Sequence, residues 1–451
     1  MTANEYTLLI VESPTIADYI NQLRIPWLEV MATGGFCWHP VFNPQKLSLG
    51  KKADPEKRAL RRELKQKSDW FNRIVIATDS DSSGDFIAWT VANFLPQKEL
   101  FRAQLRLLTE NSIMNRVSEA GKISQPNLKK KLEKRFVFRH LWNRHFRISI
   151  EDAALASLFT MINPFSAFSA TRGTIFRSDE PVRTRYNQPL NGFNIDSGYN
   201  FHRPHSTWGL LEDLTSYPLF KSFEDSANKI FELFTATQDR ELLHTISYPR
   251  TDASGYYKST WNRIEAEWIK SLDLEKLLPP SARNILSDAV PHESIHPTNI
   301  FQTPDKMRGL LKPDLFFIYT QIYKRFMKSI TWETSDCLFF EGECGIRLYP
   351  QNSSEVQDSL SITPRWTVES AGDRLCALGA VRPAAYGKKL DRWISRDLLK
   401  RNGIYLEPKG ILKYDPELIS SCHDTLIKAR EIIDREEMGR DELKQLFPIS
   451  R

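Results

Sequence analysis

The chain has 451 residues, of which 41% are hydrophobic and 26% charged. This is the composition of an ordinary globular protein, and the length predicts about two to four structural units. Lys and Arg total 62 against 56 Asp and Glu, and a net charge of +6 does not by itself indicate nucleic acid. The N-terminus has only a short apolar run and no charged leader, so we expect no signal peptide, no membrane span and a cytoplasmic location. No G-x-x-x-x-G-K-[ST] loop occurs, which argues against an ATP-driven motor.

The basic residues are unevenly distributed. "KKADPEKRALRRELKQK" (51–67) and "KKKLEKRFVFRHLWNRHFR" (129–147) each hold eight Lys or Arg. Either run alone is typical of a solvated helix face. Together with the aromatic residues of the second run, they favour a phosphate-binding surface with base-stacking partners. The five cysteines are scattered without a C-x-x-C pair, which indicates a reducing compartment and no zinc ribbon.

Strands and helices are predicted to alternate near the N-terminus. "TLLIV" (7–11) is apolar throughout, as in a strand buried on both faces. The next residues predict a helix in which Ser13 is the N-cap and Pro14 takes the first position. Further strands are expected at 27–32, 73–78 and 104–108. This order predicts an α/β unit with a mostly parallel sheet.

The chain becomes more helical beyond about residue 125. Residues 176–207 lack periodicity and predict a long connection or short irregular strands. Helices are expected over 208–246 and 312–330, and two short strands over 336–350. The C-terminal part, 379–451, has the pattern of a helix, a strand at "GIYLEP" and a further helix.

Three carboxylates follow two of the predicted strands. Glu12 comes directly after the first strand, and Asp79 and Asp81 directly after "RIVIAT". Ligands bind beyond the carboxyl ends of strands in an open parallel sheet, and carboxylate oxygens suit Mg²⁺. A loop of helix-capping aspartates is the simpler interpretation of "DSDSSG" alone. Glu12 at the same sheet edge favours the metal site.

The stretch "PHESIHPTNI" (291–300) matches H-E-x-x-H, a pattern of zinc proteases. That pattern requires His292 and His296 to lie one helical turn apart. Pro297 follows His296 directly and pushes it out of the helical region. No third ligand stands at an obvious spacing, so the sequence argues against a zinc protease.

A lone tyrosine in an extended stretch is usually a half-buried core residue. Tyr248 is followed by Pro249, which limits regular structure, and by Arg250, which offers a guanidinium. A tyrosine can attack a phosphodiester when its phenolate is stabilised and cations hold the phosphate.

Several segments resemble a known family. "LLIVESPTIADYI" together with "VIATDSDSSGDFIAW" resembles the Toprim domain, the Mg²⁺-binding module of topoisomerases and primases. Four further segments resemble motifs of the type IA DNA topoisomerases and occur in the same order as in that family. "FSATRGT" (168–174) is similar to "LSAGRVQ", and "ISYPRTDAS" (246–254) is similar to the active-site "ITYMRTDS". "HESIHPT" (292–298) is similar to "HEAIRPT", and "GAVRPAAYG" (379–387) is similar to "GIGRPSTYA". The resemblance spans about residues 7 to 413.

The resemblance implies an α/β Toprim domain plus mainly helical (α+β) modules in a type IA topoisomerase-like toroid. It places the Toprim domain at 1–124 and the tyrosine domain at 208–298. The remainder would form a helical DNA-binding base, 125–180 and 366–451, and a reduced arch or hinge, 181–207 and 299–365.

The resemblance also implies an activity. Tyr248 would form a 5′-phosphotyrosyl bond with single-stranded or negatively supercoiled DNA, Arg250 would clamp the phosphate, and Glu12 would protonate the leaving 3′ oxygen. Mg²⁺ would lie at Glu12, Asp79 and Asp81 and support religation. The implied DNA contacts are Arg172, His292, Arg382, Arg144 and Tyr386. We expect a monomer that needs no ATP.

The sequence departs from the family at several positions. The third acid of the D-x-D-x-E pattern is Ser83, and Asp85 two residues on is a candidate replacement. The lysine of "ESPAKA" is Ile16, the histidine of "GH" is Phe36, and the aspartate of "DRL" is Asn143. These departures leave two alternatives open: a Toprim nicking or nuclease-like protein that reseals poorly, and a single-strand DNA-binding homologue without turnover.

Overall fold

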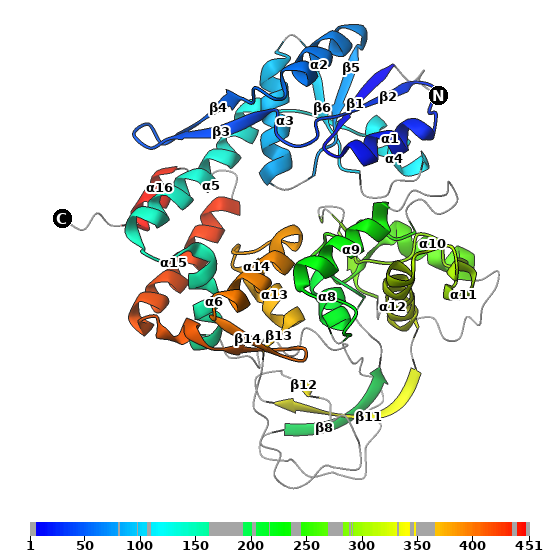
Figure 1. Ribbon diagram of the computed structural model, residues 1–451, viewed down its shortest axis with the longest axis vertical. Helices are drawn as coiled ribbons and strands as arrows, with labels where there is room; N and C mark the ends of the chain where they lie inside the picture. The colour runs from blue at the N-terminus through cyan, green and yellow to red at the C-terminus, as the bar shows by residue number, and fades with distance from the viewer. Residues whose placement is uncertain are drawn as a thin grey trace. The chain divides into compact units, whose positions relative to one another are not determined.

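The computed structural model (Figure 1) describes most of the chain in two compact units, Met1–Ile150 with Ile427–Arg451 and Glu151–Leu426. The described residues are 6–79, 82–96, 98–105, 110–161, 193–200, 204–215, 217–235, 245–268, 283–287, 290, 292–331, 333–342, 347–348, 366–434 and 440–447.

A five-stranded sheet forms the centre of the first unit. Its order is β2-β1-β5-β6-β7, with β1 (Thr7–Val11) paired in parallel with both β2 (Leu28–Ala32) and β5 (Arg73–Ile76). β6 (Leu100–Arg102) continues the parallel sheet, and β7 (Gly121–Lys122) is antiparallel to it. All five residues of β1 are buried, because helices cover both faces of such a sheet. The predicted mostly parallel α/β unit is therefore confirmed.

The helices of this unit follow the apolar patterns of the sequence. They are α1 (Pro14–Gln22), α2 (Arg58–Trp70), α3 (Ser82–Phe94), α4 (Glu110–Ser118), α5 (Gln125–His145) and α16 (Arg440–Gln445). In α1, Pro14 takes the first turn as predicted, where its missing N–H has no helical partner to lose. Ile87 and Val91 of α3 pack with Ile10 and Ile76 of the sheet in the core.

Two features of the first unit differ from the sequence prediction. The fourth strand lies at Leu100–Arg102, not at 104–108, because Leu100 and Phe101 pair in register with Ile74 and Val75. Residues 106–109 lie outside the described part. An unpredicted hairpin, β3 (Trp38–Asn43) and β4 (Ser48–Ala53), follows β2.

The second unit is mainly helical. Its helices are α6 (Ile150–Thr160), α8 (Thr207–Thr215), α9 (Phe223–Thr235), α10 (Lys258–Trp268), α11 (Pro304–Met307), α12 (Pro313–Ile330), α13 (Val368–Ala377), α14 (Pro383–Ser395) and the 3-10 turn η3 (Gly410–Lys413). α15 (Pro416–Asp434) continues from this unit into the first. The predicted helices over 208–246 and 312–330 are present, the former as α8 and α9, with residues 236–244 outside the described part.

Small sheets complete the second unit. β8 (Phe193–Asn200), β11 (Glu333–Gly342) and β12 (Arg347–Leu348) form one antiparallel sheet, which confirms the two strands predicted over 336–350. The "GIYLEP" strand is β15 (Tyr405–Pro408), between β13 (Trp366–Thr367) and β14 (Leu399–Asn402). β9 (Tyr256–Tyr257) pairs with β10 (Ile285–Leu286). In the described part of the chain, no helix has the length and apolar character needed to cross a membrane.

Candidate active site

The first candidate site is the acid edge, defined here as Glu12, Asp79 and the start of α3 in the first unit. Glu12 follows β1, and Asp79 lies three residues beyond the end of β5, the strand paired in parallel with β1. Their shared position at the carboxyl ends of neighbouring strands is the one predicted from the sequence. Both residues are half-buried. Asp81 lies outside the described residues.

A tight backbone contact shapes the acid edge. A Cβ on Gly84 would lie only 1.9 Å from the backbone oxygen of Asp79, so no other residue fits there without a shift of the backbone. The Thr78 hydroxyl donates to the Gly84 carbonyl at 2.8 Å. The loop between β5 and α3 is therefore closed on itself, and glycine is required for the close approach rather than for a special φ angle.

Arg102, at the end of β6, is hydrogen-bonded to the same loop between β5 and α3. Its guanidinium donates to the Thr78 hydroxyl at 2.9 Å and to the Asp79 carbonyl at 2.8 Å. It also lies 3.7 Å from the carboxylate of Asp85. No local pattern in the sequence marks Arg102 as a partner of Asp79, which lies 23 positions away.

Asp85 forms ion pairs with two cationic side chains of the protein. Its side chain is buried, and Lys131 of α5 lies 2.9 Å from one carboxylate oxygen. Arg102 approaches the other oxygen. A buried carboxylate held by two cations is poorly placed to replace a metal ligand. This arrangement disfavours Asp85 as the substitute for the missing third acid, and leaves Ser83, half-buried in the first turn of α3, in that position.

The donor chemistry of the acid edge fits Mg²⁺ in part. Glu12 and Asp79 offer hard carboxylate oxygens at one sheet edge, which is what this ion prefers. Among residues that the structure describes, no group of three or more His, Cys, Asp or Glu side chains is arranged to hold a metal. Because Asp81 is not among them, the three-carboxylate site stays a prediction.

The second candidate site is the tyrosine loop, defined here as residues 245–251 in the second unit. It lies against residues 292–298, with which it forms an antiparallel bridge at Ile246 and Pro297. The Ser247 amide donates to the His296 carbonyl at 2.8 Å, and the Ser247 hydroxyl donates to the Ser294 carbonyl at 3.0 Å. The same hydroxyl accepts from the His296 amide at 3.0 Å. The two segments are thereby fixed to each other across a long stretch of sequence.

Thr207, the first residue of α8, is hydrogen-bonded to the other side of the tyrosine loop. The Thr207 hydroxyl donates to the Pro249 carbonyl at 2.7 Å and accepts from the Thr251 amide at 2.9 Å. The Thr207 amide donates to the Thr251 carbonyl at 2.8 Å. Tyr248 therefore lies in a loop whose backbone is hydrogen-bonded from both sides.

The side chains of this loop form an aromatic cluster. The half-buried ring of Tyr248 lies 4.4 Å from the His292 ring and 5.5 Å from the Phe234 ring, centroid to centroid. The guanidinium of Arg250 is exposed and lies 4.1 Å above the ring of Phe231. Phe231 and Phe234 stand three residues apart on α9, a spacing that also suits an ordinary core, so no specific sequence signal marks Phe231. The structure thus brings three predicted residues, Tyr248, Arg250 and His292, into one part of the second unit.

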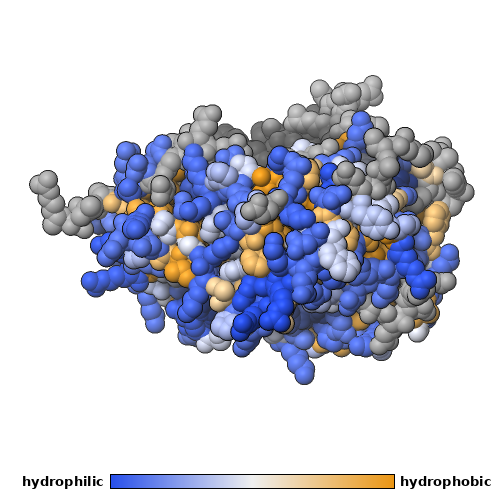
Figure 2. Space-filling view, turned by 90° about the horizontal axis from the view of Figure 1, so that it is seen from above, coloured by the Kyte–Doolittle hydropathy of each residue, from blue (hydrophilic) through white to orange (hydrophobic). Residues whose placement is uncertain are grey.

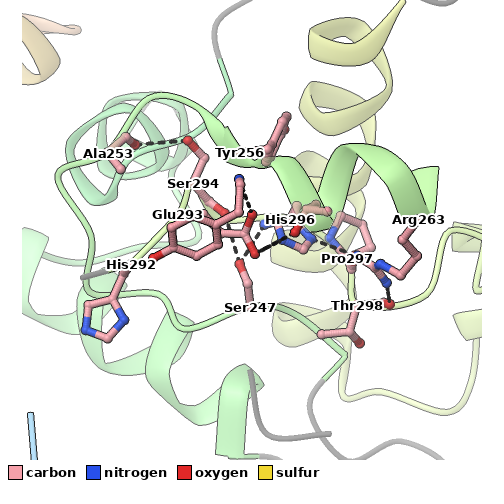
Figure 3. Close-up of polar contacts among 12 residues, drawn as sticks. Ser247, Ala253, Tyr256, Arg263, His292, Glu293, Ser294, His296, Pro297 and Thr298 are labelled. Atoms are coloured by element: carbon pink, nitrogen blue, oxygen red, sulfur yellow. Dashed lines mark hydrogen bonds and ion pairs between the residues drawn. The ribbon is translucent and has the colours of Figure 1, made fainter. Parts of the chain in front are cut away.

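The two histidines of the H-E-x-x-H stretch do not share a helix. Residues 292–298 form no helix and carry isolated β-bridges at Ile295 and Pro297, as expected from the proline after His296. Figure 3 shows His292 turned away from Glu293 and His296, which point toward each other. His296 is fully buried, with one ring nitrogen 2.8 Å from the Pro297 carbonyl and the other 3.2 Å from the Glu293 carboxylate. The prediction that this is not a zincin helix is confirmed.

Glu293 connects this pair to α10. Its carboxylate accepts from the Tyr257 amide at 3.0 Å and from the Thr260 hydroxyl at 2.9 Å. Burial raises the pKa of Glu293, but the neighbouring His296 and these hydrogen bonds outweigh burial, and the pKa is lowered. Where the family has an arginine, this chain therefore has a buried histidine paired with a buried glutamate.

The predicted DNA contacts have different environments. Arg144 is exposed in the last turn of α5, and Arg382 is half-buried at the N-cap of α14. Arg172 lies outside the described residues. Tyr386 is fully buried: its hydroxyl donates to the Val368 carbonyl at 2.7 Å, and its ring packs edge-on against Trp208. The direct DNA contact predicted for Tyr386 is therefore wrong for this conformation, because the helix turns that side chain into the core.

An α/β unit with a carboxylate-lined sheet edge, and a helical unit with an anchored tyrosine, together have the fold of topoisomerase I. The full-length topoisomerase I of Thermotoga maritima superposes with a TM-score of 0.64 over 98% of this chain and 88% of that one, at 18% identity. Helicobacter pylori DNA topoisomerase 1 is 24% identical over 398 residues, 74% of this chain and 52% of that protein. Mycoplasma pneumoniae DNA topoisomerase 1 is 22% identical over 354 residues, 61% of this chain and 48% of that protein.

These likenesses relate the chain to the type IA topoisomerase family. No protein-family model matches it. The chain spans about half the length of the curated relatives that it matches.

Proposed function

We propose that the protein is a type IA-like DNA topoisomerase that cuts one DNA strand through Tyr248, lets another strand pass and reseals the cut. The observation that carries this proposal is the tyrosine loop: its backbone is anchored on both sides, and it presents Tyr248 beside His292 and Arg250. The DNA topoisomerase 1 relatives support DNA as the substrate.

The cleavage step follows from the groups present. The Tyr248 oxygen attacks the scissile phosphorus, and its proton leaves to water. The bond from phosphorus to the 3′ oxygen breaks, and Glu12 protonates that oxygen as a general acid. Arg250 binds the phosphate, and its guanidinium is kept in place above Phe231. His292, whose ring lies tilted beside that of Tyr248, contacts the same phosphate.

Resealing is the reverse of these steps. Glu12 takes back the proton, the 3′ oxygen attacks the phosphotyrosine, and Tyr248 leaves. One phosphate ester replaces another in each direction, so the bond energy is retained and no ATP is needed. Glu12, Asp79 and Asp81 would hold Mg²⁺, which when bound supplies positive charge at the DNA backbone near the sheet edge.

The decisive test is the covalent adduct. An end-labelled single-stranded oligonucleotide should yield a protein-linked product on a denaturing gel with the wild-type chain and none with Tyr248→Phe. Strand binding should be nearly equal for the two, because only the nucleophilic oxygen is removed. An adduct that persists in Tyr248→Phe would assign the nucleophile to another residue.

A second assay separates the alternatives. Relaxation of negatively supercoiled plasmid, with and without Mg²⁺, should succeed for a topoisomerase. A nicking protein would instead accumulate open circles, and a binding homologue without turnover would leave the plasmid unchanged.

A further inference from the structure

The outer face of α2 carries a row of exposed side chains. Arg58, Arg62, Gln66 and Trp70 follow one another at intervals of four residues, so they form a line along the helix. Leu64 and Ser68 are buried on the opposite side. Trp70 is 86% exposed, whereas a side chain of this size is on average largely buried. We call these four residues the α2 row.

The arginines of the α2 row differ from the lysines of the same helix. Lys67 lies 2.6 Å from the carboxylate of Glu29, and Lys65 lies 3.7 Å from that of Asp69. Within the described part of the chain, neither Arg58 nor Arg62 has a carboxylate within 4.0 Å. The α2 row therefore presents two uncompensated guanidiniums and an open indole face. The view from the α2 side of the molecule shows a mainly hydrophilic surface (Figure 2).

The α2 row begins at the acid edge. Lys57, the N-cap of α2, donates from its ammonium to the Gly34 carbonyl at 2.9 Å, and the Gly34 amide donates to the Glu12 carbonyl at 2.8 Å. From Arg58 the helix leads away for twelve residues to Trp70, which is about 18 Å.

We propose that the α2 row binds single-stranded DNA that continues beyond the acid edge; this inference rests on the proposed function. The two guanidiniums bind successive phosphates, the Gln66 amide binds a phosphate or a base edge, and a base stacks on Trp70. Side chains four residues apart are spaced about 6 Å along the helix, and two cations followed at this spacing by an amide and an aromatic face suit a polynucleotide. An acidic peptide would match the arginines, but it has no planar group to cover the indole.

The test compares oligonucleotides of two lengths on the full chain. One is the shortest strand that still forms the adduct, and the others carry six extra thymidines on the 5′ or the 3′ side. For the wild type, fluorescence anisotropy should show tighter binding of at least one extended strand. Trp70→Ala should weaken binding of that strand about tenfold, as expected for one stacked base, and leave the short strand unaffected. Arg58→Glu with Arg62→Glu should also reduce the salt dependence of binding.

Lys67→Ala is the matched control, because it lies on the same helix and its charge is already paired with Glu29. It should bind both strands like the wild type. Equal affinity of wild type and Trp70→Ala for the extended strands would overturn the inference. So would stronger competition by a polyglutamate peptide than by the extended oligonucleotide. A wild-type chain that binds the extended strand more tightly but forms no adduct would overturn the proposed function instead.

Discussion

The acid edge and the tyrosine loop are held in place by different kinds of structure. At the acid edge, Glu12 and Asp79 follow neighbouring parallel strands, so the sheet itself sets their position. The tyrosine loop belongs to no regular sheet, and hydrogen bonds to Thr207 and to residues 292–298 hold it instead. Positions that follow from strand order are visible in the sequence, whereas positions that follow from distant contacts are visible only through a family resemblance.

The two regions also differ in how their charges are balanced. In the acid edge, Arg102 and Lys131 neutralise Asp85, which stands two residues after Ser83, the position of the missing third acid. In the tyrosine loop, the cation Arg250 is exposed and rests on an aromatic ring. The first arrangement fixes a loop, and the second leaves a cation accessible to a phosphate. Three substitutions test this comparison, beginning with the largest expected effect, and a fourth tests a buried carboxylate of α13 outside both regions.

Gly84→Ala should disrupt the acid edge most strongly. The new Cβ would meet the Asp79 carbonyl at 1.9 Å, and the necessary backbone shift should cost about 3 kcal/mol. We expect faster hydrogen exchange in β5 and α3 and loss of plasmid relaxation. Gly121→Ala is the control, since a Cβ there meets nothing within 4 Å. Unchanged exchange in Gly84→Ala would show that the loop between β5 and α3 is not tightly closed.

Ser247→Ala should loosen the tyrosine loop and leave the acid edge intact. It leaves the buried His296 amide and Ser294 carbonyl without their partner, which should cost about 2 kcal/mol. The rate of adduct formation should fall, with hydrogen exchange in β1 and β5 unchanged. Ser395→Ala, an exposed serine in the same unit, should behave like the wild type. Equal adduct rates for both variants would show that the loop does not depend on Ser247.

Ser83→Glu tests the charge count at the acid edge. A hydroxyl supplies no negative charge where the family has a carboxylate, and Mg²⁺ gives up its water reluctantly. The variant should lower the Mg²⁺ concentration that gives half-maximal relaxation. Asp85→Asn should leave that midpoint unchanged, because Asp85 is already paired with Lys131 and Arg102. A midpoint that rises in Asp85→Asn and does not move in Ser83→Glu would assign the charge to Asp85.

Glu369→Gln should have the smallest effect of the four, a change in thermal stability whose size depends on pH. Burial first, and then the carboxylate of Glu212, raise the pKa of Glu369 well above its usual value. The unfolded chain therefore loses this proton at lower pH, and the folded state is progressively destabilised as the pH rises from the usual glutamate value toward the raised one. The variant should raise the thermal midpoint at about pH 7 but barely at about pH 4. The exposed Glu417→Gln should shift neither midpoint, and an equal shift at both pH values would contradict the assignment.

The sequence by itself determined the parallel α/β unit, the carboxylates at its strand ends and the non-helical H-E-x-x-H stretch. These features depend on neighbouring residues: an apolar run such as "TLLIV", or a proline next to His296, limits the backbone wherever it occurs. The motif order also indicated the family.

The tertiary structure alone decided which side chains meet. Arg102 reaches Asp79 across 23 residues, and the amide of His296 reaches Ser247 across 49. Tyr386, in a segment that resembles a DNA-binding motif, is buried against Trp208. Such contacts depend on the register of helices and strands that are far apart in the chain, and no local pattern of residues specifies that register.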